Sequence, residues 1–189
     1  MILFALEEGP VVSPQGLFHL QHMIIWFNGP SQTQLATTLP RQSIEIGCNY
    51  IEQTRPVDAV AAFDIDVVQQ IKTNPTTQYY TRADAHLANW QLVDNHIVSG
   101  ANSGILACWI AVNCFPKQKI YIIGCDWGLT DDSSFDHIYQ KGPRRKYTNH
   151  SRKKIQMLFK HHDVEVVHDQ QPDVPLPIIT EDHFLRKIQ

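Results

Sequence analysis

Short apolar segments with the pattern of β-strands alternate along this chain with segments that have the pattern of helices. Alternation of this kind predicts an α/β fold, because two parallel strands need a long crossover connection that is usually a helix. The expected strands span residues 23–27, 43–48, 58–63, 77–81, 89–93, 119–124 and 164–167. The expected helices span residues 31–38, 65–72, 103–115 and 151–161, with Ser31 as a candidate N-cap.

The C-terminal end has a different composition, with prolines at 172, 175 and 177. Proline continues neither a helix nor a β-ladder. We therefore expect residues 171–189 to form an extended arm with a short terminal helix from about Glu181. The preceding residues 1–170 are expected to form a single Rossmann-like nucleotide-binding domain, with a mostly parallel sheet and helices on both faces.

The distribution of apolar residues and cysteines predicts a cytoplasmic protein. The longest apolar stretch, residues 105–115, is shorter than the roughly 20 residues that a membrane-spanning helix needs. Glu7 and Glu8 directly follow an apolar start that has no basic residue, unlike a secretory signal. The four cysteines contain no Cys-x-x-Cys pair, so we expect each to be a buried free thiol in a reducing environment.

The formal net charge of −3 conceals an uneven distribution, since residues 141–154 hold seven of the 16 Lys and Arg residues and no acid. The remainder is acidic, which argues against a general polyanion binder. The basic segment surrounds His150 and has no aromatic stacking platform of the kind that single-stranded nucleic acid needs. We expect it to bind a nucleotide phosphate and expect no nucleic-acid partner.

Polar turns follow several of the expected strands, and ligands of parallel α/β sheets bind beyond the carboxyl ends of the strands. The turn Asn28-Gly29-Pro30-Ser31 would direct backbone N–H groups toward an anion, although it also suits an ordinary strand–helix turn. Residues 102–104, Asn-Ser-Gly, open the most apolar helix, where they would bind a phosphate or form a simple cap.

His150 lies near the start of a basic helix. A helix N-terminus favours the neutral imidazole, which suits a general base near neutral pH. Arg144 and Arg145 would add positive potential for phosphates. The alternative is a surface histidine in a basic loop.

Asp64 and Asp66 form an Asp-x-Asp pair after an apolar strand. Paired carboxylates of this kind can hold a divalent ion against a diphosphate. Asp64 is equally typical of a helix N-cap, so a magnesium site at Asp64 and Asp66 remains an alternative.

Five short sequence elements occur in an order that resembles the small bacterial sialyltransferases of glycosyltransferase family forty-two. The resemblance extends to the related family of unknown function that includes 6-hydroxymethylpterin pyrophosphokinases. The elements are Asn28-Gly29-Pro30-Ser31, Cys48-Asn49, Asn102-Ser103-Gly104, Gly124-Cys125-Asp126 and Tyr147-Thr148-Asn149-His150-Ser151.

The resemblance implies a metal-independent enzyme without a cofactor that transfers a sugar, of sialic-acid type, from a CMP-linked donor to a glycan or small-molecule acceptor. His150 would deprotonate the acceptor hydroxyl. The implied nucleotide- and phosphate-binding residues are Asn28, Gly29, Pro30, Ser31, Asn49, Asn102, Ser103, Gly104, Asp126, Arg144, Arg145 and Tyr147. Whether the chain forms a homo-oligomer stays open.

This chain departs from the family pattern at two places. Phe27 stands where the family has the first glycine of its Gly-Asn-Gly-Pro-Ser turn. Trp127 begins the stretch where the family has tyrosines that stabilise the departing phosphate, a role that Arg144, Arg145 or Lys146 could take electrostatically. Two alternatives remain: pyrophosphoryl transfer from ATP with magnesium at Asp64, Asp66 or Asp126, and a non-catalytic nucleotide-binding protein.

Overall fold

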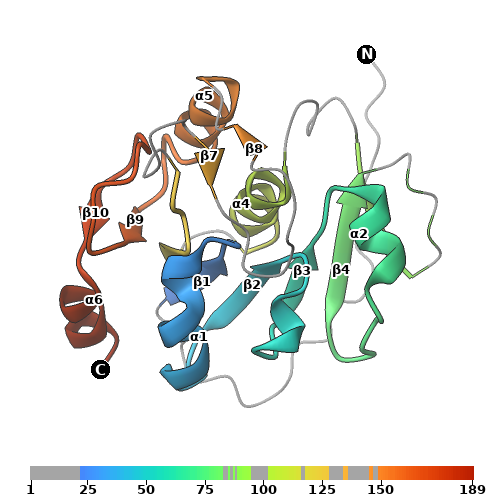
Figure 1. Cartoon of the computed structure of the whole chain (residues 1–189), viewed down its shortest axis with the longest axis horizontal. Helices are drawn as coiled ribbons and strands as arrows, with labels where there is room; N and C mark the ends of the chain where they lie inside the picture. Colours follow the sequence, from blue (N-terminus) through green and yellow to red (C-terminus); the bar gives the residue numbers. More distant parts are fainter. Residues whose placement is uncertain are drawn as a thin grey trace.

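The computed structural model describes residues 22–82, 85, 87, 89–94, 102–115, 118–127, 134–135, 145–146 and 149–189. Within these residues, eight strands form one sheet in the order β10-β9-β6-β1-β2-β3-β4-β5, and all neighbouring strands are parallel (Figure 1). The strands are β1 (His22–Trp26), β2 (Ile44–Cys48), β3 (Ala59–Ala61), β4 (Gln78–Arg82), β5 (Gln91–Val93), β6 (Lys119–Ile123), β9 (Val164–Val167) and β10 (Ile178–Ile179). The predicted α/β fold with a parallel sheet is confirmed.

The helices lie close to their predicted positions. They are α1 (Thr33–Thr38), α2 (Ile65–Gln70), α4 (Ser103–Cys114), α5 (Asn149–Leu158) and α6 (Glu181–Ile188), together with the 3₁₀ turns η1 (Pro30–Gln32) and η2 (Ile51–Gln53). A separate antiparallel pair consists of β7 (Ser134–Phe135) and β8 (Arg145–Lys146). Asn102 caps α4 by accepting a hydrogen bond from the backbone N–H of Ile105 at 3.0 Å, which fixes where this helix begins.

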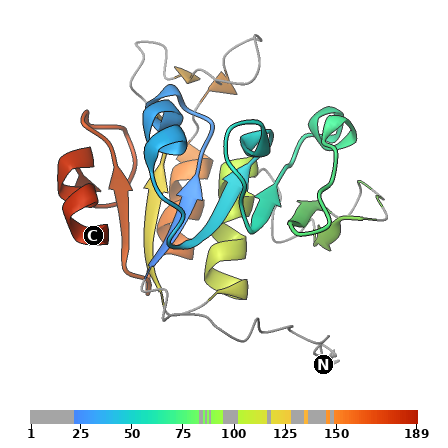
Figure 2. The same ribbon diagram turned by 90° about the horizontal axis from the view of Figure 1, so that it is seen from below.

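Helices cover both faces of the sheet, as the sequence predicts (Figure 2). Side chains alternate between the faces along each strand. Ile24 and Trp26 of β1 pack in one cluster with residues of α1, α2 and α6, whereas Met23 and Ile25 pack in a second cluster with residues of α4 and α5. Both sides of β1 are therefore buried, which explains why the strand is a continuous apolar run.

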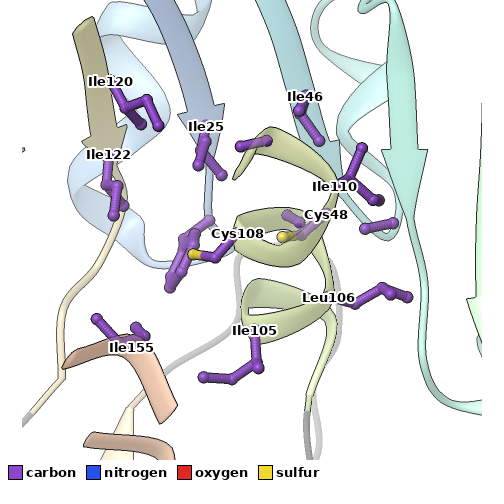
Figure 3. Close-up of a cluster of buried hydrophobic side chains, with 14 of the residues drawn as sticks. Ile25, Ile46, Cys48, Ile105, Leu106, Cys108, Ile110, Ile120, Ile122 and Ile155 are labelled. Carbon is purple, nitrogen blue, oxygen red and sulfur yellow. The ribbon is translucent and has the colours of Figure 1, made fainter. Parts of the chain in front are cut away.

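Most side chains of helix α4 are apolar, because most of the helix surface is buried. Leu106, Cys108 and Ile110 are fully buried. Figure 3 shows α4 between the strands, marked by Ile25 and Ile46, and α5, marked by Ile155. Because α4 runs antiparallel to the strands it connects, its N-terminus lies at the carboxyl edge of the sheet.

Two local expectations need correction. Ser31 does not cap the helix at 31–38; that segment is η1 followed by α1, and the Ser31 hydroxyl donates to Asp126 instead. Cys114 is exposed, because it lies in the last turn of α4; Cys48, Cys108 and Cys125 are buried as expected, and all four are free thiols.

The C-terminal segment 171–189 contributes to the sheet and to one of its hydrophobic faces. Ile178–Ile179 pair with β9 as the edge strand β10, and the Pro177 carbonyl accepts from the backbone N–H of Val166 at 2.8 Å. Helix α6 begins at Glu181, as predicted, and its Phe184 is fully buried against Tyr121. Among the described helices, none combines the length and the apolar composition that crossing a bilayer requires.

Candidate functional site

The strand order places a topological switch point beside β1. The chain proceeds from β1 through β2 to β5 on one side and then returns to form β6 on the other side of β1. Loops that leave the carboxyl ends on either side of such a point diverge, and this is where ligands of open α/β sheets bind.

A pocket lies at this carboxyl edge. It is bounded by the ends of β1, β2 and β6 and by the N-terminus of α4, and it is open to solvent. Its lining residues are Phe27, Asn28, Gly29, Cys48, Asn49, Asp64, Asn102, Ser103, Gly104, Gly124 and Trp127. Four of the five segments that carry the family resemblance therefore meet around one pocket.

The N-terminus of α4 supplies hydrogen-bond donors to this pocket. The side chain of Asn102 accepts from Ile105, and its carbonyl accepts from the backbone N–H of Leu106 at 3.0 Å. The backbone N–H groups of Ser103 and Gly104 have no partner among the described residues, as expected for the first turn of a helix. Together with the helix dipole, two such groups favour an anionic ligand.

Asn49 is held in a defined orientation next to these donors. Its backbone adopts a left-handed conformation with φ of 52°, which Asn tolerates better than most residues. Its side-chain oxygen accepts a hydrogen bond of 2.7 Å from the Ser103 hydroxyl, which itself accepts from the backbone N–H of Phe63 at 3.1 Å. With its oxygen engaged, Asn49 offers its amide NH₂ as a donor to a ligand.

Asn28 contributes a hydrogen-bond acceptor, in contrast to the donors of α4 and Asn49. Its side chain is 8% exposed, and its Oδ1 atom is buried without a hydrogen-bond partner among the described residues. A buried acceptor without a partner is costly unless water or a ligand satisfies it. The pocket thus combines donors from α4 and Asn49 with an acceptor from Asn28, a pattern that suits a ligand carrying both an anion and a hydroxyl or amino group.

Gly29 and Gly124 allow the two loops beside the switch point to touch. The backbone N–H of Gly29 donates to the Gly124 carbonyl at 3.0 Å. A β-carbon on Gly29 would overlap that carbonyl and approach the Asp126 carboxylate, and Gly124 has a φ of +80°, which side chains rarely adopt.

Asp126 faces away from the pocket and toward Ser31. Its carboxylate accepts from the Ser31 backbone N–H at 3.0 Å and from the Ser31 hydroxyl, and it also lies 3.1 Å from Nε2 of His168. Burial by itself would raise the pKa of Asp126, but the hydrogen bonds from His168 and Ser31 outweigh it, and the net pKa lies below its ordinary value. Asp126 is therefore an ionised carboxylate that anchors a turn.

Phe27 and Trp127 form an aromatic wall of the pocket, with their ring centroids 5.5 Å apart. Phe27 takes up space beside Gly104, where a β-carbon would lie 2.7 Å from the ring. Phe27 therefore helps to shape the pocket beside the α4 donors.

The remaining candidate residues are not among the lining residues that the structure describes. Pro30 is the exposed first residue of η1. His150 is exposed in the first turn of α5 and is not among the lining residues, although α5 packs against α4. Arg144 and Tyr147 lie outside the described residues; Arg145 is in β8, and its side chain lies outside the described part.

The Asp-x-Asp pair does not converge on the pocket. Asp64 lines it and is the N-cap residue of α2, whereas Asp66 is exposed on α2 and does not line it. In the described part of the chain, no group of three His, Cys, Asp or Glu side chains is arranged to hold a metal ion.

His168 is not among the site residues predicted from the sequence. This residue directly follows β9 and is 7% exposed. The rule that singled out the residues after the other strands would have identified it as well.

No protein-family model, no curated protein and no solved structure matches this chain.

Proposed function

We propose that this protein is a glycosyltransferase that transfers a sugar from a cytidine nucleotide donor to an acceptor hydroxyl without a metal ion. The observation that carries the proposal is the meeting of four separate segments around one pocket at the switch point: residues 28–29, 48–49, 102–104 and 124. These segments belong to the elements that resemble the sialyltransferase family. We also place the enzyme in the cytoplasm, because its four cysteines are free thiols.

The donors at the start of α4 support phosphate binding without a cation. The backbone N–H groups of Ser103 and Gly104 and the amide of Asn49 would bind the phosphate oxygens. Asn28 Oδ1 would accept from a hydroxyl or amino group of the same ligand.

In the proposed reaction, the bond between the sugar's anomeric carbon and the phosphate oxygen breaks, and a bond from that carbon to the acceptor oxygen forms. His150 takes the proton of the acceptor hydroxyl, and the electron pair of the broken bond leaves with the CMP phosphate. The role of His150 follows from the sequence resemblance. Its helix α5 packs against α4, the helix whose N-terminus lines the pocket.

A panel of CMP, UDP, ADP and ATP, each with excess chelator and with magnesium, tests the ligand class by thermal shift. Stabilisation by CMP that persists in chelator supports the proposal. Stabilisation by ATP that requires magnesium would instead favour pyrophosphoryl transfer.

The role of His150 is tested separately by release of CMP from CMP-sialic acid in the presence of acceptors. His150→Ala should abolish turnover and retain CMP binding. The control is His161→Ala, which removes an exposed histidine beyond the C-terminal end of α5 and should leave turnover unchanged. If the wild-type protein binds CMP but shows no turnover, the result contradicts the proposed transfer and favours a non-catalytic nucleotide-binding protein.

A further inference from the structure

A chain of buried and partly buried hydrogen bonds connects the carboxyl ends of three neighbouring strands. Ser31 follows β1, Asp126 follows β6 and His168 follows β9, and these strands are adjacent in the sheet. The Asp126 carboxylate accepts from both the backbone N–H and the hydroxyl of Ser31, and its Oδ1 lies 3.1 Å from Nε2 of His168. Asp126 and His168 are each less than one-tenth exposed.

The backbone after β9 defines which nitrogen of His168 carries the proton. The backbone N–H of Gln170 donates to His168 Nδ1 at 2.9 Å, so Nδ1 acts as an acceptor. In the neutral imidazole the proton then lies on Nε2, which donates it to Asp126. The main chain of His168 is held in place because its backbone N–H donates to the Ile179 carbonyl of β10 at 2.9 Å.

We propose that His168 is a positioning residue: through Asp126 it fixes the turn 28–31, and thereby the orientation of Asn28 at the pocket. His168 and Asp126 do not line the pocket, so neither touches the ligand directly. The part of this inference that concerns nucleotide affinity rests on the proposed function; the part that concerns the turn does not.

Two contacts place the turn 28–31: the Gly29 N–H donates to the Gly124 carbonyl, and Ser31 donates to Asp126. Gly29 leaves no space for a β-carbon on the side that faces Asp126, so the turn packs tightly on the carboxylate. The side-chain oxygen of Asn28 has no partner among the described residues that would hold it independently. Without the His168 contact, the Asp126 carboxylate keeps only its two hydrogen bonds from Ser31, and we expect the turn to open more readily.

Two substitutions distinguish the roles of the two ring nitrogens of His168. His168→Gln retains an N–H donor at about the reach of Nε2, whereas His168→Asn retains an acceptor at about the position of Nδ1 but does not reach Asp126. The first readout is hydrogen exchange of the Ser31 amide in the ligand-free full chain. The reference is the Gln53 amide, which donates to Tyr50 in η2, away from this network.

We expect His168→Asn to reduce the protection of the Ser31 amide at least tenfold, as in local opening, while the Gln53 amide stays protected. His168→Gln should restore the protection of Ser31. Unchanged Ser31 protection in His168→Asn, or an equal loss in both variants, would overturn the proposal. An equal loss at Ser31 and Gln53 would also overturn it, because that result indicates general destabilisation.

The second readout is the dissociation constant of CMP. We expect it to rise about tenfold in His168→Asn and to return toward the wild-type value in His168→Gln. A loss of Ser31 protection with unchanged CMP affinity would overturn the link to the ligand. If the wild-type protein does not bind CMP, the proposed function fails, whereas the exchange measurement still decides the role of His168.

Discussion

The ring of Phe27 lies in the position that limits residue 104 to glycine: a β-carbon on Gly104 would be 2.7 Å from the ring edge. Phe27 directly follows β1, and Gly104 is the second residue of α4. This contact therefore joins the sheet to the helix at the pocket. The aromatic residue at 27 and the glycine at 104 therefore have to be considered as a pair.

This pairing predicts an effect of Gly104→Ala that depends on residue 27. In the wild-type background we expect a loss of about 1–3 kcal/mol in the free energy of unfolding, because the new methyl group meets the buried ring. In a Phe27→Leu background the same change should be neutral or stabilising, since alanine is the better helix former by up to about 1 kcal/mol. Urea denaturation of the four proteins measures the coupling; additive effects would contradict the contact.

The buried ion pair of Arg55 and Glu45 predicts a large loss in the free energy of unfolding when one partner is removed. Arg55 binds both oxygens of Glu45 and the carbonyls of Ala36 and Leu39, and the Trp26 indole also donates to Glu45. Arg55→Leu should cost about 3–5 kcal/mol, because it leaves Glu45 charged and buried.

The exposed pair of Arg41 and Asp58 is the matched control for that prediction. Arg41→Ala should cost less than about 1 kcal/mol, because solvent screens an exposed pair. Equal losses for Arg55→Leu and Arg41→Ala in the same denaturation experiment would contradict the assignment of Glu45 and Arg55 as a buried pair.

The lowered pKa of Asp126 predicts a contribution to acid stability. Its folded-state pKa lies below the ordinary value of 3.8, because hydrogen bonds from His168 and Ser31 outweigh burial. This contribution is therefore complete well above the ordinary value and is lost as the pH falls through the lower folded-state value. Asp126→Asn removes a titrating group, so its free energy of unfolding should decline less steeply than that of the wild type below about pH 4. Parallel curves for the two proteins would contradict the lowered pKa.

Thiol accessibility predicts a simple labelling pattern. Cys48, Cys108 and Cys125 are buried, and burial raises the pKa of each thiol, whereas Cys114 is exposed. An aromatic disulfide reagent should label only Cys114 in the folded protein and all four cysteines in denaturant. Mass spectrometry identifies the labelled residue, and rapid labelling of Cys48 would show that the pocket side of β2 is open.

The sequence predicts this fold well where a local pattern suffices. The strand at 164–167 is found with its predicted bounds, because Val-Glu-Val-Val between polar residues has few other interpretations. β10 was not predicted, because two residues after Pro177 carry no pattern of their own and become a strand only by pairing with β9.

The candidate site was predictable for a different reason. Turns after parallel strands gather at one edge whatever their detailed structure, so Asn28, Asn49 and Asp64 could be assigned to one edge of the sheet in advance. The bond between Asp126 and His168 depends on the register that pairs Ile123 with Val167, which a sequence does not display. The fit of Phe27 against Gly104 likewise depends on how α4 lies on the sheet.

The central claim is that the N-terminus of α4 binds the phosphate of a cytidine nucleotide. Asn102→Asp tests it directly, because aspartate retains the cap to Ile105 and even favours the helix, but it places a negative charge beside the ligand's phosphate. Thr180→Asp makes the same kind of change at the cap of α6, away from the pocket.

The decisive measurement is calorimetric titration of CMP, in excess chelator, into the wild-type protein and these two variants. We predict binding to the wild type and to Thr180→Asp with the same affinity, and binding to Asn102→Asp that is at least about tenfold weaker, a loss of about 1.4 kcal/mol. Equal affinity of all three proteins, or no binding of CMP to the wild type, would contradict the claim.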